Sequence, residues 1–504
     1  MMMADFDLLS VQEARNLLYK AREAQKKLAE LSQEQIDRIV ENMALEAEKH
    51  ASFLARMATE ETGFGNETDK TIKNIFAAKE VYAAIKDMKT VGIIGSDENK
   101  QVWEIAEPVG VIAGVIPSTN PTSTIIFKSL IAVKSRNAIV FSPHPSALKC
   151  SLEAAKIMAK AAKEAGAPEN IIQCMEYPSL PGTRELMSHK LTDVILATGG
   201  PAMVKAAYSS GKPAYGVGPG NVPVYVHTSA DLDQAARHII ESKSFDYGTI
   251  CASEQAVVVE REIKQDFIDK LKKYGAYLLS EMEKERIESI LLTGGTLNPK
   301  IVGKSPQAIG KMAGLFFPAE IKVLIGEEKE IGKNIPFSIE KLSPILALYT
   351  VDGWEEGCDV CIKLLEAGGL GHTFGIHCQD QAVIKAFALK QPASRIVVNS
   401  GTAFGGIGAT TGIFPSLTLG CGSYGNNITS DNIGPQHLIN IKRVAFGIKG
   451  MMIKTTKSGT LQPAKTADAS ETEKNISVDR GGNVTVSREE IAEIVKRILS
   501  EMKI

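Results

Sequence analysis

Apolar residues recur at helical spacing in the first part of the chain. The clearest stripe follows Ser32 and comprises Ile36, Ile39, Val40, Met43, Ala44 and Ala47. Intervals of three and four residues place these side chains on one face of a helix, which predicts that this face packs against a core. Two pairs have the spacing of a capping box and predict helix starts, Ser10 with Glu13 and Ser32 with Gln35.

From about residue 90 onward, short runs rich in β-branched residues alternate with helical patterns. The predicted strands are 111–116, 138–141, 194–197, 222–226, 256–259 and 396–399. Helical patterns such as 147–165 and 232–243 separate them. Strands that are apolar throughout are buried on both faces, so the alternation predicts parallel sheets covered by helices, in two α/β domains.

Two regions depart from this alternation. Residues 91–107 alternate on either side of a polar turn at 96–99, which predicts an antiparallel hairpin that can serve as an arm between subunits. After residue 452 the chain is rich in Lys, Thr, Ser, Ala and Glu, a composition typical of a linker.

The last residues regain helical spacing. Ser487 and Glu490 offer a capping box, and the apolar stripe after them is Ile491, Ile494, Val495, Ile498, Leu499 and Met502. An amphipathic helix this short is marginal in water and needs a partner. Two partners are open, the body of the same chain and another protein.

Composition and charge exclude some classes of function. At 504 residues, with a net charge of -2, the chain has room for two or three domains but no field that would hold nucleic acid or an anionic membrane. The longest uncharged stretch, 108–127, contains prolines and the polar run 118–120, whose backbone lipid would not satisfy. The N-terminus lacks the basic and apolar regions of a secretory signal, so we expect a cytoplasmic protein.

The cysteines offer one candidate for chemistry. There are 7, scattered and odd in number, which favours free thiols in a reducing compartment. Cys358 and Cys361 form a CxxC in a predicted helix, 354–367, without a second half, so we expect them in the core and no metal site. Cys251 lies in a turn of small residues ahead of the strand 256–259; by itself it is a small buried residue or a nucleophile.

Three segments in a fixed order give Cys251 its context. They are residues 116–124 around Asn120, the turn of Cys251, and residues 340–346, which begin with Glu340. Over about residues 10–450 their order resembles the aldehyde dehydrogenase superfamily, and within it the CoA-acylating propionaldehyde, acetaldehyde and butyraldehyde dehydrogenases. The match includes the N-terminal half of bifunctional aldehyde-alcohol dehydrogenases. The resemblance implies that Cys251 is the nucleophile, that Asn120 stabilises the oxyanion, and that Glu340 contacts the nicotinamide ribose.

The same resemblance implies a nicotinamide cofactor. Residues 141–146 are similar to the family segment in which a lysine usually meets the adenosine ribose, and His144 stands at that position. His144 is therefore a ribose contact or only a surface loop residue, and NAD and NADP both stay open. The turn at 198–200 resembles the one on the pyrophosphate side, where helix N-terminal amides meet phosphate. The implied cofactor contacts are Glu340, His144, Thr198, Gly199, Gly200, Pro117 and Ser118.

One departure from the superfamily bears on what accepts the acyl group. Hydrolytic members hold a glutamate that activates water, but the matching residues here, 215–223, contain no carboxylate. Without a general base water is a poor acceptor, whereas a coenzyme A thiol exchanges with a thioester. We expect acyl-CoA as the product. Two alternatives are a hydrolytic enzyme with its base elsewhere, for which Glu254 is nearest, and a non-catalytic microcompartment scaffold.

The nucleophile and three loops carry further expectations. A free thiol has a pKa of ~8.5, so the site should favour the thiolate of Cys251. Residues 420–425 fit GxGxxG but lack the strand and helix of a dinucleotide-binding motif, so we expect a loop that lines the substrate entrance. Residues 414–417 and 372–374 resemble segments around the family's acyl pocket.

We therefore predict an aldehyde dehydrogenase-like α/β fold, with two parallel-sheet domains, a small β arm and a tail helix. The parts are a dinucleotide-binding domain at 1–235, interrupted by the arm hairpin 92–109, a catalytic domain at 236–434, an oligomerisation strand at 435–451, a linker at 452–486 and an amphipathic tail helix at 487–504. By resemblance, the arm implies a homodimer or homotetramer. The tail resembles encapsulation peptides, which implies a shell protein as partner and short-chain aldehyde chemistry inside a bacterial microcompartment.

Overall fold

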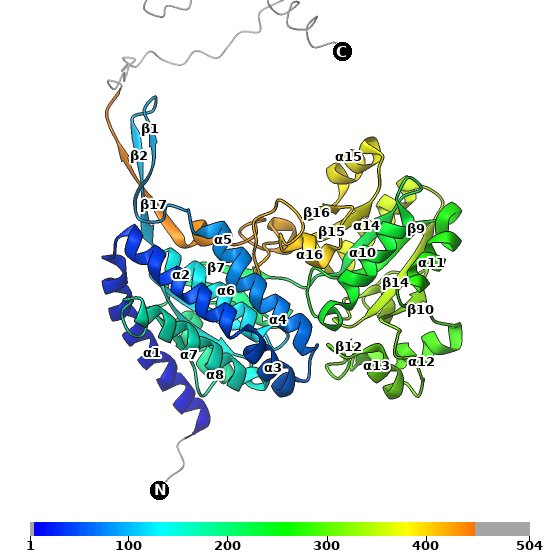
Figure 1. The fold of residues 1–504 in the computed structure, drawn as a ribbon, viewed down its shortest axis with the longest axis horizontal. Coiled ribbons are helices and arrows are strands. Elements are labelled where there is room, and N and C mark those ends of the chain that lie inside the picture. Colours follow the sequence, from blue (N-terminus) through cyan, green and yellow to red (C-terminus); the bar gives the residue numbers. More distant parts are fainter. Residues whose placement is uncertain (1–4, 449–504) are drawn as a thin grey trace, which may run out of the picture. The chain divides into compact units, whose positions relative to one another are not determined.

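The computed structural model describes residues 5–448, whose centre is formed by two β-sheets (Figure 1). One sheet has five strands in the order β5-β4-β3-β6-β7, and the other has seven in the order β10-β13-β14-β9-β8-β15-β16. Every strand pairing in both sheets is parallel. The two predicted parallel-sheet layers are therefore present, whereas the predicted linker 452–486 and tail helix 487–504 lie outside the described residues.

The five-stranded sheet is wrapped by the first nine α-helices. Its strands are β3 (Val111–Ile116), β4 (Ala138–Pro143), β5 (Ile172–Cys174), β6 (Val194–Thr198) and β7 (Ala214–Val217). The helices are α1 (Phe6–Ala29), α2 (Gln33–Lys49), α3 (Ala51–Thr62), α4 (Glu67–Ile75), α5 (Val81–Ile85), α6 (Pro121–Lys134), α7 (Leu148–Glu164), α8 (Leu180–Ser188) and α9 (Pro201–Tyr208). Helices α6 and α7 pack on the sheet with α2 and α3 outside them, so α6 is buried along its whole length.

The seven-stranded sheet collects strands from the second half of the chain. They are β8 (Val222–Val226), β9 (Glu254–Glu260), β10 (Ala276–Leu278), β13 (Val323–Glu327), β14 (Ile345–Val351), β15 (Gly371–His377) and β16 (Ala393–Val398). Its helices are α10 (Leu232–Ser244), α11 (Lys264–Lys273), α12 (Glu281–Leu291), α13 (Pro306–Met312), α14 (Trp354–Gly368), α15 (Gln381–Lys390) and α16 (Thr402–Gly406). A two-stranded hairpin, β11 (Leu292–Thr293) with β12 (Thr296–Leu297), adjoins α12.

Strand β9 explains why this sheet reads as continuous apolar runs in the sequence. Val257 and Val259 point to a core shared with residues of α10 and α11, while Ala256 and Val258 point to a second core shared with residues of α14. Successive side chains of a strand face opposite sides of its sheet. Because helices cover both faces, neither set of side chains can be polar, which is the physical basis of the predicted pattern.

Two sequence expectations need correction. Strand β8 ends before residue 235 but pairs with β9 and β15, so the second sheet already begins at Val222 rather than after residue 235. Helix α1 begins at Phe6 with Asp5 as its N-cap, so Ser10 is a buried interior residue of that helix and caps nothing. Glu13 instead accepts hydrogen bonds from the backbone N–H groups of Glu176 and Tyr177. The second capping box, Ser32 with Gln35, is confirmed at the start of α2.

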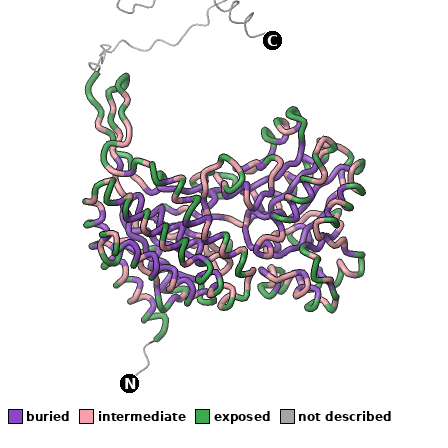
Figure 2. Tube along the Cα trace, viewed as in Figure 1, coloured by how far each residue is buried: buried purple, intermediate pink, exposed green. Residues whose placement is uncertain are grey.

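A three-stranded antiparallel arm extends from the two-sheet body. The hairpin β1 (Gly92–Asp97) and β2 (Val102–Pro108) pairs with β17 (Ile439–Ala445), which joins segments far apart in sequence (Figure 1). The predicted hairpin is confirmed, and the strand predicted within 435–451 is β17. Apolar side chains of the arm, including Ile93, Trp103 and Ile441, are exposed. Figure 2 colours most of the arm exposed or intermediate, in contrast to the buried sheets.

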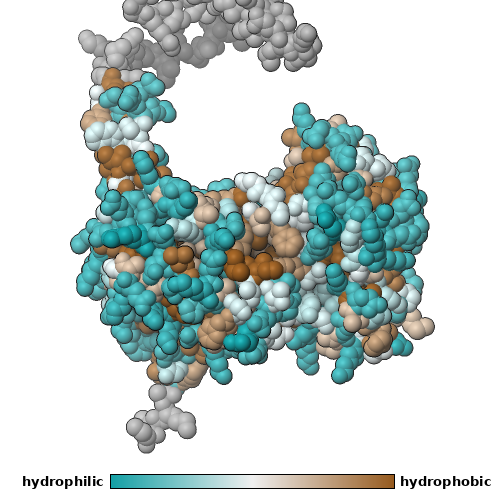
Figure 3. All heavy atoms as spheres, viewed as in Figure 1, coloured by the Kyte–Doolittle hydropathy of each residue, from teal (hydrophilic) through white to brown (hydrophobic). Residues whose placement is uncertain are grey.

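The surface agrees with the charge balance of the sequence. Hydrophilic residues cover most of the face seen in Figure 3, and hydrophobic residues gather near its middle and on the arm. Within residues 5–448, no helix is long and apolar enough to cross a membrane.

Candidate active site

One large cavity, of about 980 Å³, contains every residue that the sequence analysis assigned to the site. Those residues are Cys251, Asn120, Glu340, His144, Thr198, Gly199, Gly200, Pro117 and Ser118. They come from the last residue of β6, from the loops that follow β3, β4 and β6 of the first sheet, and from two segments that precede β9 and β14 of the second. Parallel strands place the loops at their carboxyl ends along one edge, which is where ligands bind in such sheets.

The turn that carries Cys251 is held in an unusual backbone conformation. After α10 ends at Ser244, Asp246 and Tyr247 both adopt left-handed φ angles, of 47° and 51°. Such angles cost free energy in residues other than glycine and persist only where surrounding contacts fix them. Gly220 packs against this turn so closely that a Cβ there would lie 1.8 Å from the Cys251 carbonyl oxygen. The nucleophile segment is thus fixed on both sides.

Burial raises the pKa of the Cys251 thiol to about 12, and the nearby Glu340 carboxylate raises it further, while Arg395 opposes the shift. The surroundings of the sulfur therefore favour the thiol, which is opposite to the direction expected from the sequence. The physical reason is desolvation, because removing water from a thiol disfavours its charged form. Cys251 needs an added positive charge or hydrogen-bond donor at its sulfur before it can act as a nucleophile near neutral pH.

Asn120 lies beside the Cys251 turn at the start of α6. It occupies the N-cap position, ahead of Pro121, and its side-chain Nδ2 donates to the carbonyl oxygen of Thr249 and to Thr119 Oγ1, both at 3.2 Å. Its Oδ1 accepts from the ammonium group of Lys73 on α4 at 2.5 Å. The amide therefore spans the gap between the two sheets, with its NH₂ end next to the segment of the nucleophile.

Glu340 is the only carboxylate among the residues that line the cavity. Its Oε1 accepts the Gly220 backbone N–H at 3.0 Å. Burial raises the pKa of Glu340 to about 7, although the N–H of Gly220 and the ammonium groups of Lys243 and Lys341 favour the charged form. Lys243 was missed in the sequence, where a lysine near the end of a helix carries no signal of its own.

The other end of the cavity suits a dinucleotide. Thr198 Oγ1 is buried without a hydrogen-bond partner, and a Cβ on Gly200 would meet nothing within 4 Å. An orphaned hydroxyl beside open space fits a ligand oxygen such as that of a pyrophosphate. His144 is exposed at the rim, where its Nδ1 contacts Ser146 Oγ at 2.8 Å. Pro178 and Leu180 also line this end, and no sequence pattern pointed to them.

The positions of Glu254 and of the CxxC pair bear on two alternatives from the sequence. Glu254 does not line the cavity; its carboxylate is buried and accepts from Ser242 Oγ and the Thr402 backbone N–H, both at 2.7 Å. It is therefore not placed to activate water at the thioester. Cys358 and Cys361 are buried in the core of the second sheet, and residues 5–448 contain no cluster suited to a metal ion.

The loops predicted near the substrate entrance contribute less than expected. Residues 420–425 form turns and a short 3₁₀ helix, without the strand and long helix of a dinucleotide motif, and do not line the cavity. Leu417 and Leu419, just before them, do so instead. Of the segments 414–417 and 372–374, only Leu417 reaches the lining, because His372 and Phe374 are fully buried in β15.

Comparison with known proteins now defines the class. The model of the aldehyde dehydrogenase family matches residues 2–285. The acetylating aldehyde dehydrogenase of Geobacillus thermoglucosidasius is 63% identical with a TM-score of 0.89, covering 90% of this chain and 100% of that one. The chain belongs to the aldehyde dehydrogenase family.

Two further relatives place it within the family. Aldehyde-alcohol dehydrogenase 2 of Entamoeba histolytica is 48% identical over 426 residues, which is 82% of this chain and 49% of that protein. The chain thus spans about half the length of this relative. A propionaldehyde dehydrogenase from the fucose utilisation bacterial microcompartment of Clostridium phytofermentans is 28% identical with a TM-score of 0.79, covering 88% of this chain and 98% of that one.

Proposed function

We propose that the protein is a CoA-acylating aldehyde dehydrogenase that converts a short-chain aldehyde, coenzyme A and NAD(P)⁺ to acyl-CoA and NAD(P)H. One observation carries the proposal. The cavity holds a cysteine and a side-chain amide, and residues 215–223, where hydrolytic members carry the glutamate that activates water, supply no carboxylate to its lining. The one carboxylate in the lining, Glu340, accepts the Gly220 backbone N–H through Oε1. The similarity to an acetylating enzyme over the whole length of that enzyme supports it.

The residues account for each step of the chemistry. Cys251 Sγ adds to the carbonyl carbon, and the oxyanion formed accepts a hydrogen bond from Asn120 Nδ2. Loss of hydride from that carbon leaves a thioester on Cys251; a bound oxidised nicotinamide supplies the hydride acceptor and a positive charge that favours the thiolate. The thiolate of coenzyme A then attacks the thioester carbonyl, the acyl group transfers to its sulfur, and the Cys251 thiolate leaves.

We propose that particular residues of the cavity hold the parts of the cofactor. Thr198, Gly199 and Gly200 would hold the pyrophosphate, Glu340 the nicotinamide ribose, and His144 the adenosine ribose. Pro117 and Ser118 would lie along the dinucleotide between these contacts. The side chain of His144 does not favour NAD over NADP or the reverse. The proposal therefore includes both cofactors.

The test measures NAD(P)H formation from propionaldehyde with and without coenzyme A. We expect sustained turnover only with coenzyme A, and without it a single burst that leaves an acyl adduct on Cys251, detectable by mass spectrometry. A Cys251→Ala variant should form no adduct. Free acid produced at the same rate without coenzyme A would support the hydrolytic alternative, and no cofactor reduction in either case would support the scaffold alternative.

Glu340 offers a second test of the same point. If Glu340 only contacts the cofactor ribose, Glu340→Gln should raise the KM for the cofactor while the ratio of acyl-CoA to free acid stays unchanged. A fall in residual acid formation on this substitution would instead make Glu340 a base for water and contradict the acylating proposal.

The assembly and cellular place of the enzyme are also proposed. The exposed apolar arm suits a homodimer or homotetramer, and the amphipathic stripe at 491–502 suits a shell protein of a bacterial microcompartment. A fusion of residues 480–504 to a fluorescent protein should form foci in compartment-forming cells. Its control carries Ile494→Glu and Ile498→Glu; diffuse fluorescence of the unaltered fusion would refute targeting.

A further inference from the structure

We propose that Lys73, on α4, is a positioning residue for the amide of Asn120. Lys73 fixes which end of that amide faces the reacting carbonyl, and it holds a positive charge next to the amide oxygen. The inference rests on the proposed role of Asn120 as the oxyanion donor, and it concerns a residue to which no sequence motif drew attention.

Each hydrogen of the Lys73 ammonium group has an acceptor. Its three hydrogens match three acceptors, Asn120 Oδ1 at 2.5 Å, Asp246 Oδ2 at 2.5 Å and Thr249 Oγ1 at 3.0 Å. The residue is 4% exposed and lines the cavity. A buried lysine with every donor used is held in one place and cannot serve as a mobile surface charge.

This arrangement decides the orientation of the amide. An ammonium group donates only, so the Asn120 atom next to Lys73 must be the oxygen. The NH₂ end is then turned toward Thr249 and the segment of Cys251. If the amide were reversed, its oxygen would face the developing oxyanion and repel it. A charge-assisted hydrogen bond on the oxygen also polarises the amide, which makes its N–H groups stronger donors.

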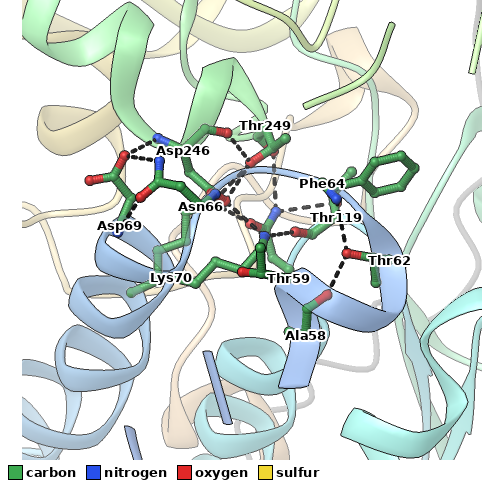
Figure 4. Close-up of polar contacts among 12 residues, drawn as sticks. Ala58, Thr59, Thr62, Phe64, Asn66, Asp69, Lys70, Thr119, Asp246 and Thr249 are labelled. Carbon is green, nitrogen blue, oxygen red and sulfur yellow. Dashed lines mark hydrogen bonds and ion pairs between the residues drawn. The ribbon is translucent and has the colours of Figure 1, made fainter. Parts of the chain in front are cut away.

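Lys73 is itself anchored by Asp246, in the left-handed turn before Cys251. Figure 4 shows Asp246 with its other partners Asn66, Asp69 and Lys70. Asp246 Oδ2 accepts from Lys70 and Lys73, its Oδ1 accepts the Asn66 backbone N–H, and its own N–H donates to Asp69 Oδ2. The cluster therefore links α4, the turn of the nucleophile and the loop before α6. It sets the distance between a nucleophile and an oxyanion donor that come from different sheets.

Lys70 provides a matched control on the same helix. It is also buried and binds the same Asp246 oxygen, at 2.9 Å, but its other contact is the Thr119 carbonyl oxygen rather than the Asn120 side chain. If the cluster only neutralises Asp246, the two lysines should be equivalent. If Lys73 positions Asn120, they should differ.

The charge on Lys73 also gives a pH signature. Burial lowers the pKa of Lys73 to about 8, against the attraction of Asp246, with Lys70 lowering it and Asp69 raising it. Above that pH the ammonium loses its proton and the polarisation of Asn120 weakens. A guanidinium stays charged over this range, so Lys73→Arg should not lose activity in the same interval.

The experiment is a double-mutant cycle on the full chain, with kcat for acyl-CoA formation as the readout. Asn120→Ala should lower kcat by about 10²- to 10³-fold, as loss of an oxyanion donor does. Lys73→Met should lower it by about ten- to a hundredfold in the wild type, the value of a hydrogen bond to a charged group, but by less than about twofold when Asn120→Ala is already present. Lys70→Met should cost clearly less than Lys73→Met.

Each outcome bears on a different claim. Full activity of Asn120→Ala would contradict the proposed role of Asn120 itself. An equal effect of Lys73→Met in the wild type and in the Asn120→Ala variant would overturn only the inference about Lys73. If Lys73→Met fails to fold, Lys73→Arg decides the matter. The ratio of its kcat to that of the wild type should rise between pH 7 and 9, and a constant ratio would overturn the proposal.

Discussion

At the residue scale, the site combines a thiol that is poorly ionised with a separate set of groups that can stabilise an oxyanion. Cys251 is recognisable in the sequence only through its order with Asn120 and Glu340, since a cysteine in a turn of small residues is otherwise unremarkable. Its protonation state could not be read there, because desolvation depends on what packs around the sulfur. The sequence analysis also missed Lys73 and Lys243, because the residues that they act on are far away in the sequence.

The first prediction concerns the pH dependence of that thiol. Because burial raises the pKa of Cys251 to about 12, the thiolate fraction, and with it the rate of alkylation by iodoacetamide, should climb throughout pH 7 to 10 without a plateau. Mass spectrometry of the Cys251 peptide measures this rate for the enzyme without cofactor. A plateau near pH 7 would mean that the thiolate is already favoured.

The second prediction uses the close approach at Gly220. A Cβ at this position would lie 1.8 Å from the Cys251 carbonyl oxygen, so Gly220→Ala must displace the nucleophile turn. Overpacking of this kind costs about 1 to 3 kcal/mol, which denaturant unfolding can measure, and kcat should fall with it. Gly412→Ala is the control, since a Cβ there meets nothing within 4 Å. Equal stability of the two variants would contradict the packing argument.

At the scale of elements, the strand predictions succeeded where burial on both faces produced a continuous apolar run. Strands β3 and β8 have the predicted bounds. Helix starts were less secure: Ser32 with Gln35 is a capping box, but Ser10 with Glu13 is not. The spacing is identical in both pairs, and only the earlier start of α1 at Asp5 makes Ser10 an interior residue.

The third prediction concerns the arm. Ile93 on β1 and Ile441 on β17 are exposed apolar residues, at 53% and 43%, on an antiparallel sheet with no helix covering them in the described chain. Replacing both by glutamate should weaken self-association, because the charges would have to be buried at an interface. Sedimentation velocity should show a smaller species. Lys100→Glu at the hairpin tip is the control, and an unchanged mass for the double variant would remove the arm from the interface.

At the scale of the whole molecule, the site exists only because two sheets meet. Asn120 follows a strand of the first sheet, whereas Cys251 and Glu340 precede strands of the second. The boundary predicted at residue 235 missed the assignment of β8, since a buried parallel strand looks the same in either sheet. Pairing partners, not local sequence, decide which sheet a strand joins.

The fourth prediction is that catalysis resides in the two-sheet body. The described residues that line the cavity fall between Phe64 and Leu419, so a chain ending at residue 451 should keep kcat within about twofold. The assay is NAD(P)H formation with propionaldehyde and coenzyme A. A large loss of kcat would show that the removed segment acts on the site.

The sequence by itself determined the α/β class, most strands, the arm hairpin and a set of candidate residues that share one cavity, because alternating periodicity and ordered motifs are local properties of the chain. The tertiary structure alone decided the protonation of Cys251, the isolation of Glu254 from the cavity and the cluster of Lys73 with Asp246. These depend on desolvation and on contacts between residues far apart in sequence, and neither can be predicted from a single segment of the chain.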